Sequence, residues 1–160
     1  MTASIFVYGT LQRGRANHHV LADLGARFVR PACSKAPRTL VDLGPYPAVL
    51  RADGTRDASA TCVRGELHEI DDAALTALDI FEGCPTLFAR EPITLTTDAG
   101  DVEAFVYVLA LTSLPPHARI VPTGIYEATG RALPHGAAAV RLDVKLKRRE
   151  NARTEKGQRG

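Results

Sequence analysis

The sequence predicts a small α+β domain built on a curved, mostly antiparallel or mixed sheet. Six or so segments have the β-branched, aromatic or alternating character of strands, whereas only two segments show a clear helical pattern. Two helices are too few for a doubly wound parallel sheet, in which a helix follows most strands. The chain has 160 residues, about the length of one domain. We therefore assign residues 1–144 to a single domain.

The first 50 residues are expected to contain strands, one loop and one short helix. Residues 4–8 (Ser-Ile-Phe-Val-Tyr) resemble a buried strand, and residues 9–14 follow as a loop that has a glycine at each end. Asn17 can cap a short helix, which Gly25 closes. Three more strands are expected at residues 27–33, 39–43 and 46–50, the last two on either side of the turn Gly44-Pro45.

The rest of the chain adds a strand, a second helix and a hairpin. Residues 52–60 are polar and rich in turn formers, which predicts a surface loop or a hairpin tip. The regular elements are a strand at 62–70, a helix from the Asp71-Asp72 pair to Glu82, and paired strands at 88–96 and 102–109. Two proline-rich stretches, at 114–116 and 133–136, predict irregular structure packed over the sheet.

The composition is that of an ordinary soluble protein, with 45% hydrophobic and 24% charged residues. No apolar run approaches the roughly 20 residues of a membrane span. The first residues lack the basic start and long apolar stretch of a signal peptide. We therefore expect a cytoplasmic protein that has no membrane partner.

The positive charge is concentrated at the C-terminal end. Residues 145–160 carry seven Lys or Arg against two Glu, a balance of +5, so the rest of the chain sums to −3 (2 minus 5). Such a stretch predicts a flexible, solvated tail. No aromatic residue interleaves these charges, and we do not expect nucleic-acid binding.

A carboxylate occupies an apolar position of the second predicted helix. At about 100° per residue, Glu82 returns to within roughly 20° of Leu75. Gly83-Cys84-Pro85 then ends the helix, because glycine allows a left-handed turn and proline cannot continue the helix. Apolar surroundings and the negative end of the helix dipole should raise the pKa of Glu82, which suits proton transfer near neutral pH. A structural ion pair with Arg90 is the alternative interpretation.

The turn after the first strand is the second candidate for a site. In Tyr8-Gly9-Thr10-Leu11, the glycine lets the backbone approach a ligand closely, and successive N–H groups can bind an anion or a polarised carbonyl. The run lacks the Gly-Lys-Ser/Thr ending of a phosphate loop and the glycine spacing of a dinucleotide site. Taken alone, these residues are better explained as a plain strand-to-loop turn.

Cysteine and histidine patterns predict no metal site. The three cysteines are widely spaced and form no C-x-x-C pair, and the five histidines show no ligand spacing. Cys84 is adjacent to the candidate site, but the sequence indicates no base that could activate its thiol.

Together, the turn and the Glu82 helix resemble a known family. The residues that carry the resemblance are Val7–Leu11 with Gly14, Asn17 and Leu21, then Gly65–Ile70, Leu78–Pro85 and Arg90. They are similar to the two signatures of the γ-glutamyl cyclotransferase-like proteins. The γ-glutamylamine cyclotransferase branch is favoured by Phe81–Leu87, Tyr46-Pro47 and Pro134-His135-Gly136.

The resemblance implies a small mixed, mostly antiparallel β-barrel with a few peripheral helices. It implies release of 5-oxoproline and an amine from a small-molecule γ-glutamyl amine, without metal or organic cofactor. By motif position, Glu82 is the acid/base, and Tyr8, Gly9, Thr10 and Leu11 are the substrate-binding turn. Phe88 stands where many members have tyrosine, which bears on the choice of substrate.

Two other functions fit the same residues. One is a deprotecting cyclotransferase that removes a γ-glutamyl cap from a biosynthetic intermediate such as an aminoglycoside. The other is a non-catalytic module that binds a small amino-acid-like ligand. The presence of Glu82 favours an enzyme, because a simple binding module has no need of a buried acid.

Overall fold

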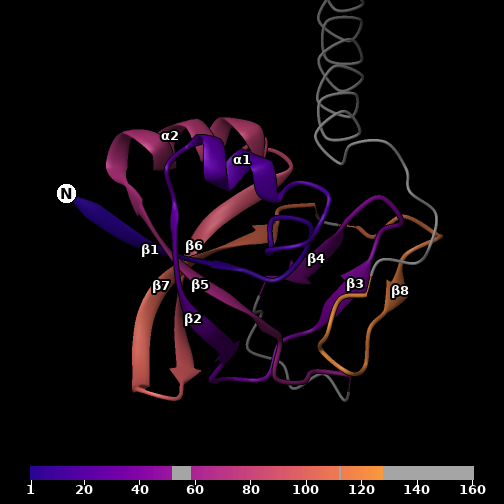
Figure 1. The fold of residues 1–160 in the computed structure, drawn as a ribbon. Helices are drawn as coiled ribbons and strands as arrows, with labels where there is room; N and C mark the ends of the chain where they lie inside the picture. The colour runs from indigo at the N-terminus through magenta and orange to yellow at the C-terminus, as the bar shows by residue number, and fades with distance from the viewer. Residues whose placement is uncertain (52–58, 112, 128–160) are drawn as a thin grey trace, which may run out of the picture.

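The computed structural model describes residues 1–51, 59–111 and 113–127, and within them it shows eight strands and two helices (Figure 1). The elements in chain order are β1 (Thr2–Val7), α1 (His18–Asp23), β2 (Arg27–Ser34), β3 (Leu40–Asp42), β4 (Pro47–Leu50), β5 (Arg64–Asp71), α2 (Asp72–Phe81), β6 (Phe88–Thr97), β7 (Gly100–Leu109) and β8 (Arg119–Ile120). Among these described elements, no helix combines the length and the apolar character that crossing a membrane requires.

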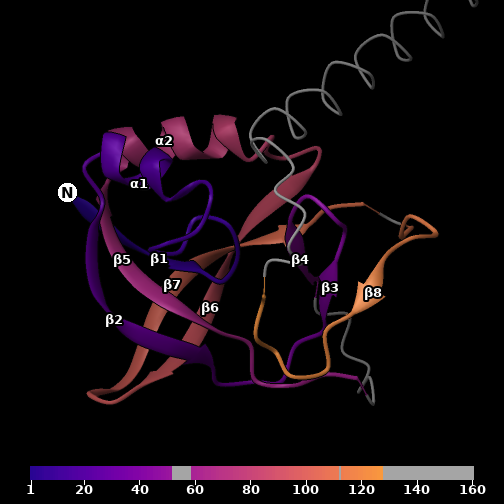
Figure 2. The same cartoon turned by 45° about the vertical axis from the view of Figure 1, so that its right-hand side comes forward.

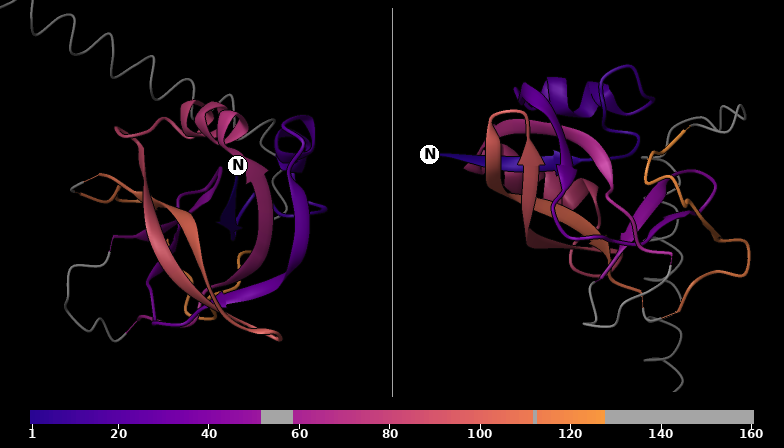
Figure 3. Two further views of the ribbon diagram at one scale, coloured as in Figure 1. Left: turned by 90° about the vertical axis from the view of Figure 1, so that its left-hand side faces the viewer. Right: turned by 90° about the horizontal axis from the view of Figure 1, so that it is seen from below.

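Five strands close into a barrel in the order β1-β5-β2-β6-β7 (Figure 3). The first four neighbouring pairs are antiparallel. β1 then pairs with β7 in parallel, with Ile5 opposite Phe105 and Phe6 opposite Val106, and this pairing completes the ring. Closure leaves both long edges of the sheet paired. The structure confirms the mixed, mostly antiparallel barrel.

Three short strands extend the sheet beyond β7, in the order β4-β3-β8 (Figure 2). β4 runs parallel to β7, with Val49 opposite Val108, and β3 pairs with β4 as a hairpin. β8 lies in the region for which the sequence predicted only irregular structure. Its two residues pair with β3 over Val41 and Asp42, and two residues are too few to leave a pattern in the sequence.

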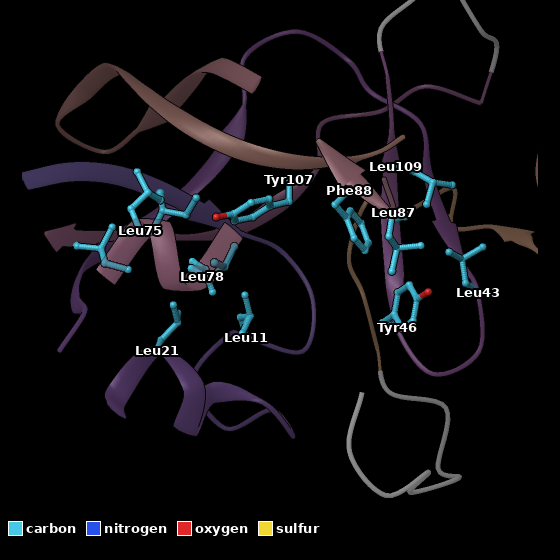
Figure 4. Packing of buried hydrophobic residues seen from close by; sticks show 14 of the residues in the cluster. Leu11, Leu21, Leu43, Tyr46, Leu75, Leu78, Leu87, Phe88, Tyr107 and Leu109 are labelled. Atoms are coloured by element: carbon cyan, nitrogen blue, oxygen red, sulfur yellow. The ribbon is translucent and has the colours of Figure 1, made fainter. Parts of the chain in front are cut away.

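Both helices lie at the same end of the barrel (Figures 1 and 2). α2 begins where the Asp71 side chain accepts a hydrogen bond from the Ala74 N–H at 2.7 Å. Leu75 and Leu78 are buried on its inner face, and Gly83 ends it at φ +70°. Figure 4 shows Leu75 and Leu78 facing Leu21 of α1 and Leu11 of the preceding loop across one apolar cluster.

The predicted strands and helices are present, with shifts of at most two residues at their ends. The exception is the cap of α1, because the Asn17 side chain makes no capping hydrogen bond. Most of the predicted 52–60 loop, the 133–136 stretch and the 145–160 tail lie outside the described residues, so the domain limit at residue 144 stays a prediction.

Candidate active site

Glu82 lies immediately after the last residue of α2. Its N–H donates to the Leu78 carbonyl at 2.9 Å, so the backbone of Glu82 is held by the helix. Gly83 then turns the chain away with a positive φ, a conformation that costs glycine little. The side chain is half-buried and lines a cavity.

The cavity joins Glu82 to the turn after β1. Its empty volume is about 500 Å³, part of which is open solvent. The residues that line it are Phe6, Val7, Tyr8, Gly9, Thr10, Leu11, Asn17, Tyr46, Pro47, Phe81, Glu82, Phe88 and Tyr107. All five residues that the sequence singled out, Glu82 and the four of the turn, are therefore in one cavity.

Burial raises the pKa of the Glu82 carboxyl to about 8, and the negative charge of Asp79 adds to the shift. The predicted direction is therefore correct. The alternative ion pair is wrong: the Nε atom of Arg90 lies 3.0 Å from Asp79 Oδ1, and within the described ranges Glu82 has no ion-pair partner. Glu82 therefore holds its proton near neutral pH.

Asp79 is the centre of a polar network beside the cavity. Besides the ion pair with Arg90, it accepts a hydrogen bond from the hydroxyl of Tyr107 at 2.7 Å. The Arg90 guanidinium also lies over the ring of Phe105, 4.7 Å from its centroid. Burial, followed by the Asp79 hydrogen bond and charge, holds the pKa of Tyr107 far above its usual value. Tyr107 is thus a fixed, neutral part of the cavity wall.

Gly9 is required by the close approach of Pro47. A Cβ atom at position 9 would lie 2.6 Å from Pro47 Cγ and 2.9 Å from Pro47 Cδ, both too close for van der Waals contact. Pro47 begins β4 and belongs to the cavity wall. The turn and β4 therefore pack together only if position 9 has no side chain.

Three of the four carbonyl groups of the Tyr8–Leu11 turn are held by the following residues. The Gly9 oxygen accepts from the Gln12 N–H at 3.2 Å, and the Thr10 oxygen accepts from the Asn17 N–H at 2.9 Å. The Leu11 oxygen lies 3.0 Å from His18 Nδ1. In a trans peptide the N–H points away from the carbonyl of the preceding residue. The N–H groups of Thr10 and Leu11, two residues of the cavity wall, donate to no acceptor in the described part of the chain.

Tyr8 contributes its side chain to the fold. Its hydroxyl donates to the Tyr107 carbonyl at 2.7 Å and accepts from the Val49 N–H at 2.9 Å, which links β7 to β4. Burial holds the pKa of this phenol far above its usual value. The Tyr8 hydroxyl therefore stabilises the cavity wall by joining β4 to β7.

Asn17, which we predicted to be a helix cap, lies in the wall of the cavity. Its side chain lines the cavity, is 2% exposed, and donates from Nδ2 to Thr10 Oγ1 at 3.0 Å. Its position within the first family signature was the only signal of this role in the sequence.

Other groups near the cavity are less suited to catalysis than Glu82. Burial, with the charges of Asp79 and Glu82, raises the pKa of the Cys84 thiol to about 12, so it stays protonated and unreactive. Over the described ranges, no group of three His, Cys, Asp or Glu side chains is arranged to hold a metal ion. Glu82 is thus the group in the cavity best suited to exchange protons near neutral pH.

Known proteins resemble this chain in both sequence and fold. The family model described as γ-glutamyl cyclotransferase, AIG2-like, matches residues 5–128. The γ-glutamylaminecyclotransferases of Rattus norvegicus and Homo sapiens are each 35% identical over 152 residues, 84% of this chain and 93% and 94% of their own length. The crystal structure of an AIG2-like protein from Mus musculus superposes with a TM-score of 0.66 at 32% identity, covering 81% of this chain and 91% of that one. This chain belongs to the AIG2-like γ-glutamyl cyclotransferase family.

Proposed function

We propose that the protein is a γ-glutamylamine cyclotransferase, which converts a γ-glutamyl amine into 5-oxoproline and a free amine. The observation that carries this proposal is a carboxyl group with a pKa of about 8 that shares one cavity with a turn offering free backbone N–H groups. Two relatives named γ-glutamylaminecyclotransferase, 35% identical over most of their length, support the same reaction.

The first task of such a site is to fold the substrate on itself. Its α-amine must approach its γ-carbonyl carbon, because this contact closes the five-membered lactam ring. Holding the two groups in that pose is worth up to roughly 7–11 kcal/mol of the barrier. The rings of Tyr46, Phe88 and Tyr107 in the cavity wall can pack against the carbon chain of the substrate in this folded pose.

The second task is to stabilise the negative charge that develops on the γ-carbonyl oxygen. The N–H groups of Thr10 and Leu11 can donate to this oxygen or to the substrate carboxylate. Their orientation is set before substrate arrives, because the turn's carbonyls are bonded to residues 12–18. No reorganisation is then needed as the charge appears.

The third task is proton transfer, which we assign to Glu82. As carboxylate it removes a proton from the α-ammonium, and the amine lone pair then forms the new N–C bond at the γ-carbon. The ring nitrogen of the resulting tetrahedral intermediate still carries two hydrogens. Glu82 passes the first proton to the leaving nitrogen, the C–N bond breaks, and the regenerated carboxylate removes the second proton from the ring nitrogen, which leaves the neutral lactam. Glu82 then gives this proton to the free amine, which departs as an ammonium ion. Atoms and charges balance with no oxidant, reductant or water consumed. This type of catalysis is typically worth 10²- to 10⁴-fold.

Incubation of the purified protein with γ-glutamyl-lysine and with a γ-glutamylated aminoglycoside tests the function. Formation of 5-oxoproline together with free lysine supports the γ-glutamylamine reaction. Release from the aminoglycoside alone would assign the deprotecting reaction instead. Release of 5-oxoproline from neither compound would contradict both, and binding without turnover would favour the non-catalytic module.

A further inference from the structure

The side chain of Asn17 has a feature that its packing does not explain. Its carboxamide is 2% exposed and its Nδ2 is bonded to Thr10, yet its Oδ1 is buried and has no hydrogen-bond partner among the described residues. Leaving a buried acceptor unpaired costs about 1–3 kcal/mol. Such a cost is expected where a ligand completes the hydrogen bonding.

The backbone holds this carboxamide firmly in the cavity. The Asn17 N–H donates to the Thr10 carbonyl at 2.9 Å, and its own carbonyl accepts from the Val20 N–H at 3.0 Å. The side chain is therefore anchored on both sides, next to the turn and within the same cavity as Glu82. Exchanging the amide oxygen and nitrogen would pair Oδ1 with the Thr10 hydroxyl and leave Nδ2 unpaired, so one amide atom lacks a partner in either orientation.

We propose that Asn17 is a substrate-binding residue whose Oδ1 accepts a hydrogen bond from the α-ammonium group of the γ-glutamyl substrate. This inference rests on the proposed function. The carboxylate and γ-carbonyl of the substrate need donors, which the backbone of Thr10 and Leu11 provides. The α-ammonium needs acceptors. The Tyr8 hydroxyl already both donates and accepts within the fold, and the Thr10 hydroxyl accepts from Asn17 Nδ2. The buried Asn17 Oδ1 is an acceptor that the fold leaves to the ammonium.

A neutral acceptor suits the chemistry better than a second carboxylate. A carboxylate beside the α-ammonium would stabilise its charged form and oppose the loss of the proton that must precede attack. The Asn17 amide orients the nitrogen without this added stabilisation. Glu82 is then the single group that both faces the substrate and accepts its proton.

Binding measurements that compare two ligands test the role of Asn17. The background is the Glu82→Gln protein, which holds the substrate without consuming it. One ligand is a γ-glutamyl amine, and the other is the same amide built on glutarate, which lacks only the α-amine. We expect the Glu82→Gln protein to prefer the amine-bearing ligand by about 10- to 100-fold, the strength of one charge-assisted hydrogen bond.

Adding Asn17→Ala should remove most of this preference while binding of the glutarate ligand stays within a few-fold. A loss that is equal for both ligands indicates a purely structural role and overturns the proposal, as does an unchanged preference. Asn17→Asp keeps the shape and the acceptor, so the preference should persist or grow. Weaker binding of both ligands by that variant would mean that the amide donates to the substrate carboxylate, which also overturns it.

Gln12→Ala is the matched control for the loop. Gln12 bonds to the Gly9 carbonyl from Nε2 at 3.3 Å but is not part of the cavity wall. Its removal can loosen the turn, yet the preference for the amine-bearing ligand should remain. If the Glu82→Gln protein binds neither ligand, the proposed function itself fails, and this outcome is distinct from the loss of preference at Asn17.

Discussion

Glu82 occupies a position where its surroundings, more than its own chemistry, set its protonation. Burial and the negative charge of Asp79 both disfavour the carboxylate, and Arg90 offsets the Asp79 charge without reaching Glu82. With a pKa of about 8, most Glu82 side chains carry a proton at pH 7. A small minority are carboxylates, and this is the form that accepts the substrate's proton.

This protonation predicts the pH dependence of turnover. Below its pKa Glu82 is protonated and cannot act as the base, so kcat/KM should rise with pH to about 8. It should fall again when the substrate's α-ammonium ionises, because the proton to be transferred is then missing. Measurement of kcat/KM from pH 5 to 10 checks this shape, and a rising limb centred near pH 4.5 would contradict the raised pKa.

Asp79→Asn should move that rising limb to lower pH, by up to about one unit. The substitution removes the negative charge that disfavours ionisation of Glu82, while its amide oxygen can still accept from Tyr107. Asp72→Asn is the control, since it removes an exposed carboxylate from the first turn of the same helix. Equal shifts in the two variants would show that a general charge effect is being measured instead of a contact near Glu82.

At the scale of elements, the site is formed where one strand and one helix end, at the turn after β1 and at the C-terminus of α2. Hydrogen bonds to neighbouring residues hold each of these segments. The turn after β1 is fixed by hydrogen bonds to residues 12–18, and Glu82 is fixed by the last turn of α2. Both segments therefore carry their geometry without help from a ligand. A rigid site of this kind reduces the entropy cost of orienting the substrate.

Gly9→Ala should reduce kcat/KM by about 100-fold while the fold is retained. The new Cβ would meet Pro47 Cγ at 2.6 Å, so the turn or β4 must shift, and displacements near 1 Å at a site have effects of this size. Adding Pro47→Ala removes the Cγ and Cδ atoms and should restore part of the activity. A double variant that is no more active than Gly9→Ala would show that the contact with Pro47 is not the cause.

Asp71→Ala should lower the free energy of unfolding by about 1 kcal/mol, because the Ala74 N–H loses the acceptor that starts α2. Turnover per folded molecule should stay close to the parent value, since Asp71 lies at the far end of the helix from Glu82. Denaturant unfolding and steady-state kinetics on one preparation measure both. A large drop in kcat without a loss of stability would mean that α2 is not the rigid support described above.

At the scale of the molecule, the site depends on the closure of the barrel. The cavity takes residues from β1, its following turn, β4, α2, β6 and β7. The parallel pairings of β7 with β1 and with β4 bring together segments that are far apart in the sequence. The Tyr8 hydroxyl reinforces the arrangement by bonding to both β4 and β7.

The sequence predicts those features of the site that depend on residues close together in the chain. The inward position of Glu82 follows from its spacing to Leu75, and the turn follows from Gly9. The pairing of Arg90 with Asp79 could not be predicted, because it depends on where β6 passes α2. Asn17 looked like a helix cap because capping is the commonest use of Asn before a helix, whereas its true contacts are with the folded turn.

Removal of residues 145–160 should leave 5-oxoproline release within about two-fold of the full chain. Within the described ranges, the residues in the wall of the cavity lie between Phe6 and Tyr107, far from the basic segment in the sequence. Kinetics of the truncated and full-length proteins with one γ-glutamyl amine measure the difference. A loss of more than ten-fold would assign the basic segment a direct part in the reaction.

The central claim is that Glu82 moves both protons of the reaction, and Glu82→Gln tests it most directly. The amide has nearly the same shape but cannot exchange a proton at neutral pH. We predict that 5-oxoproline release from a γ-glutamyl amine falls by about 10²- to 10⁴-fold, while the variant folds and binds 5-oxoproline as before. Turnover that stays within a few-fold of the parent protein would contradict the account.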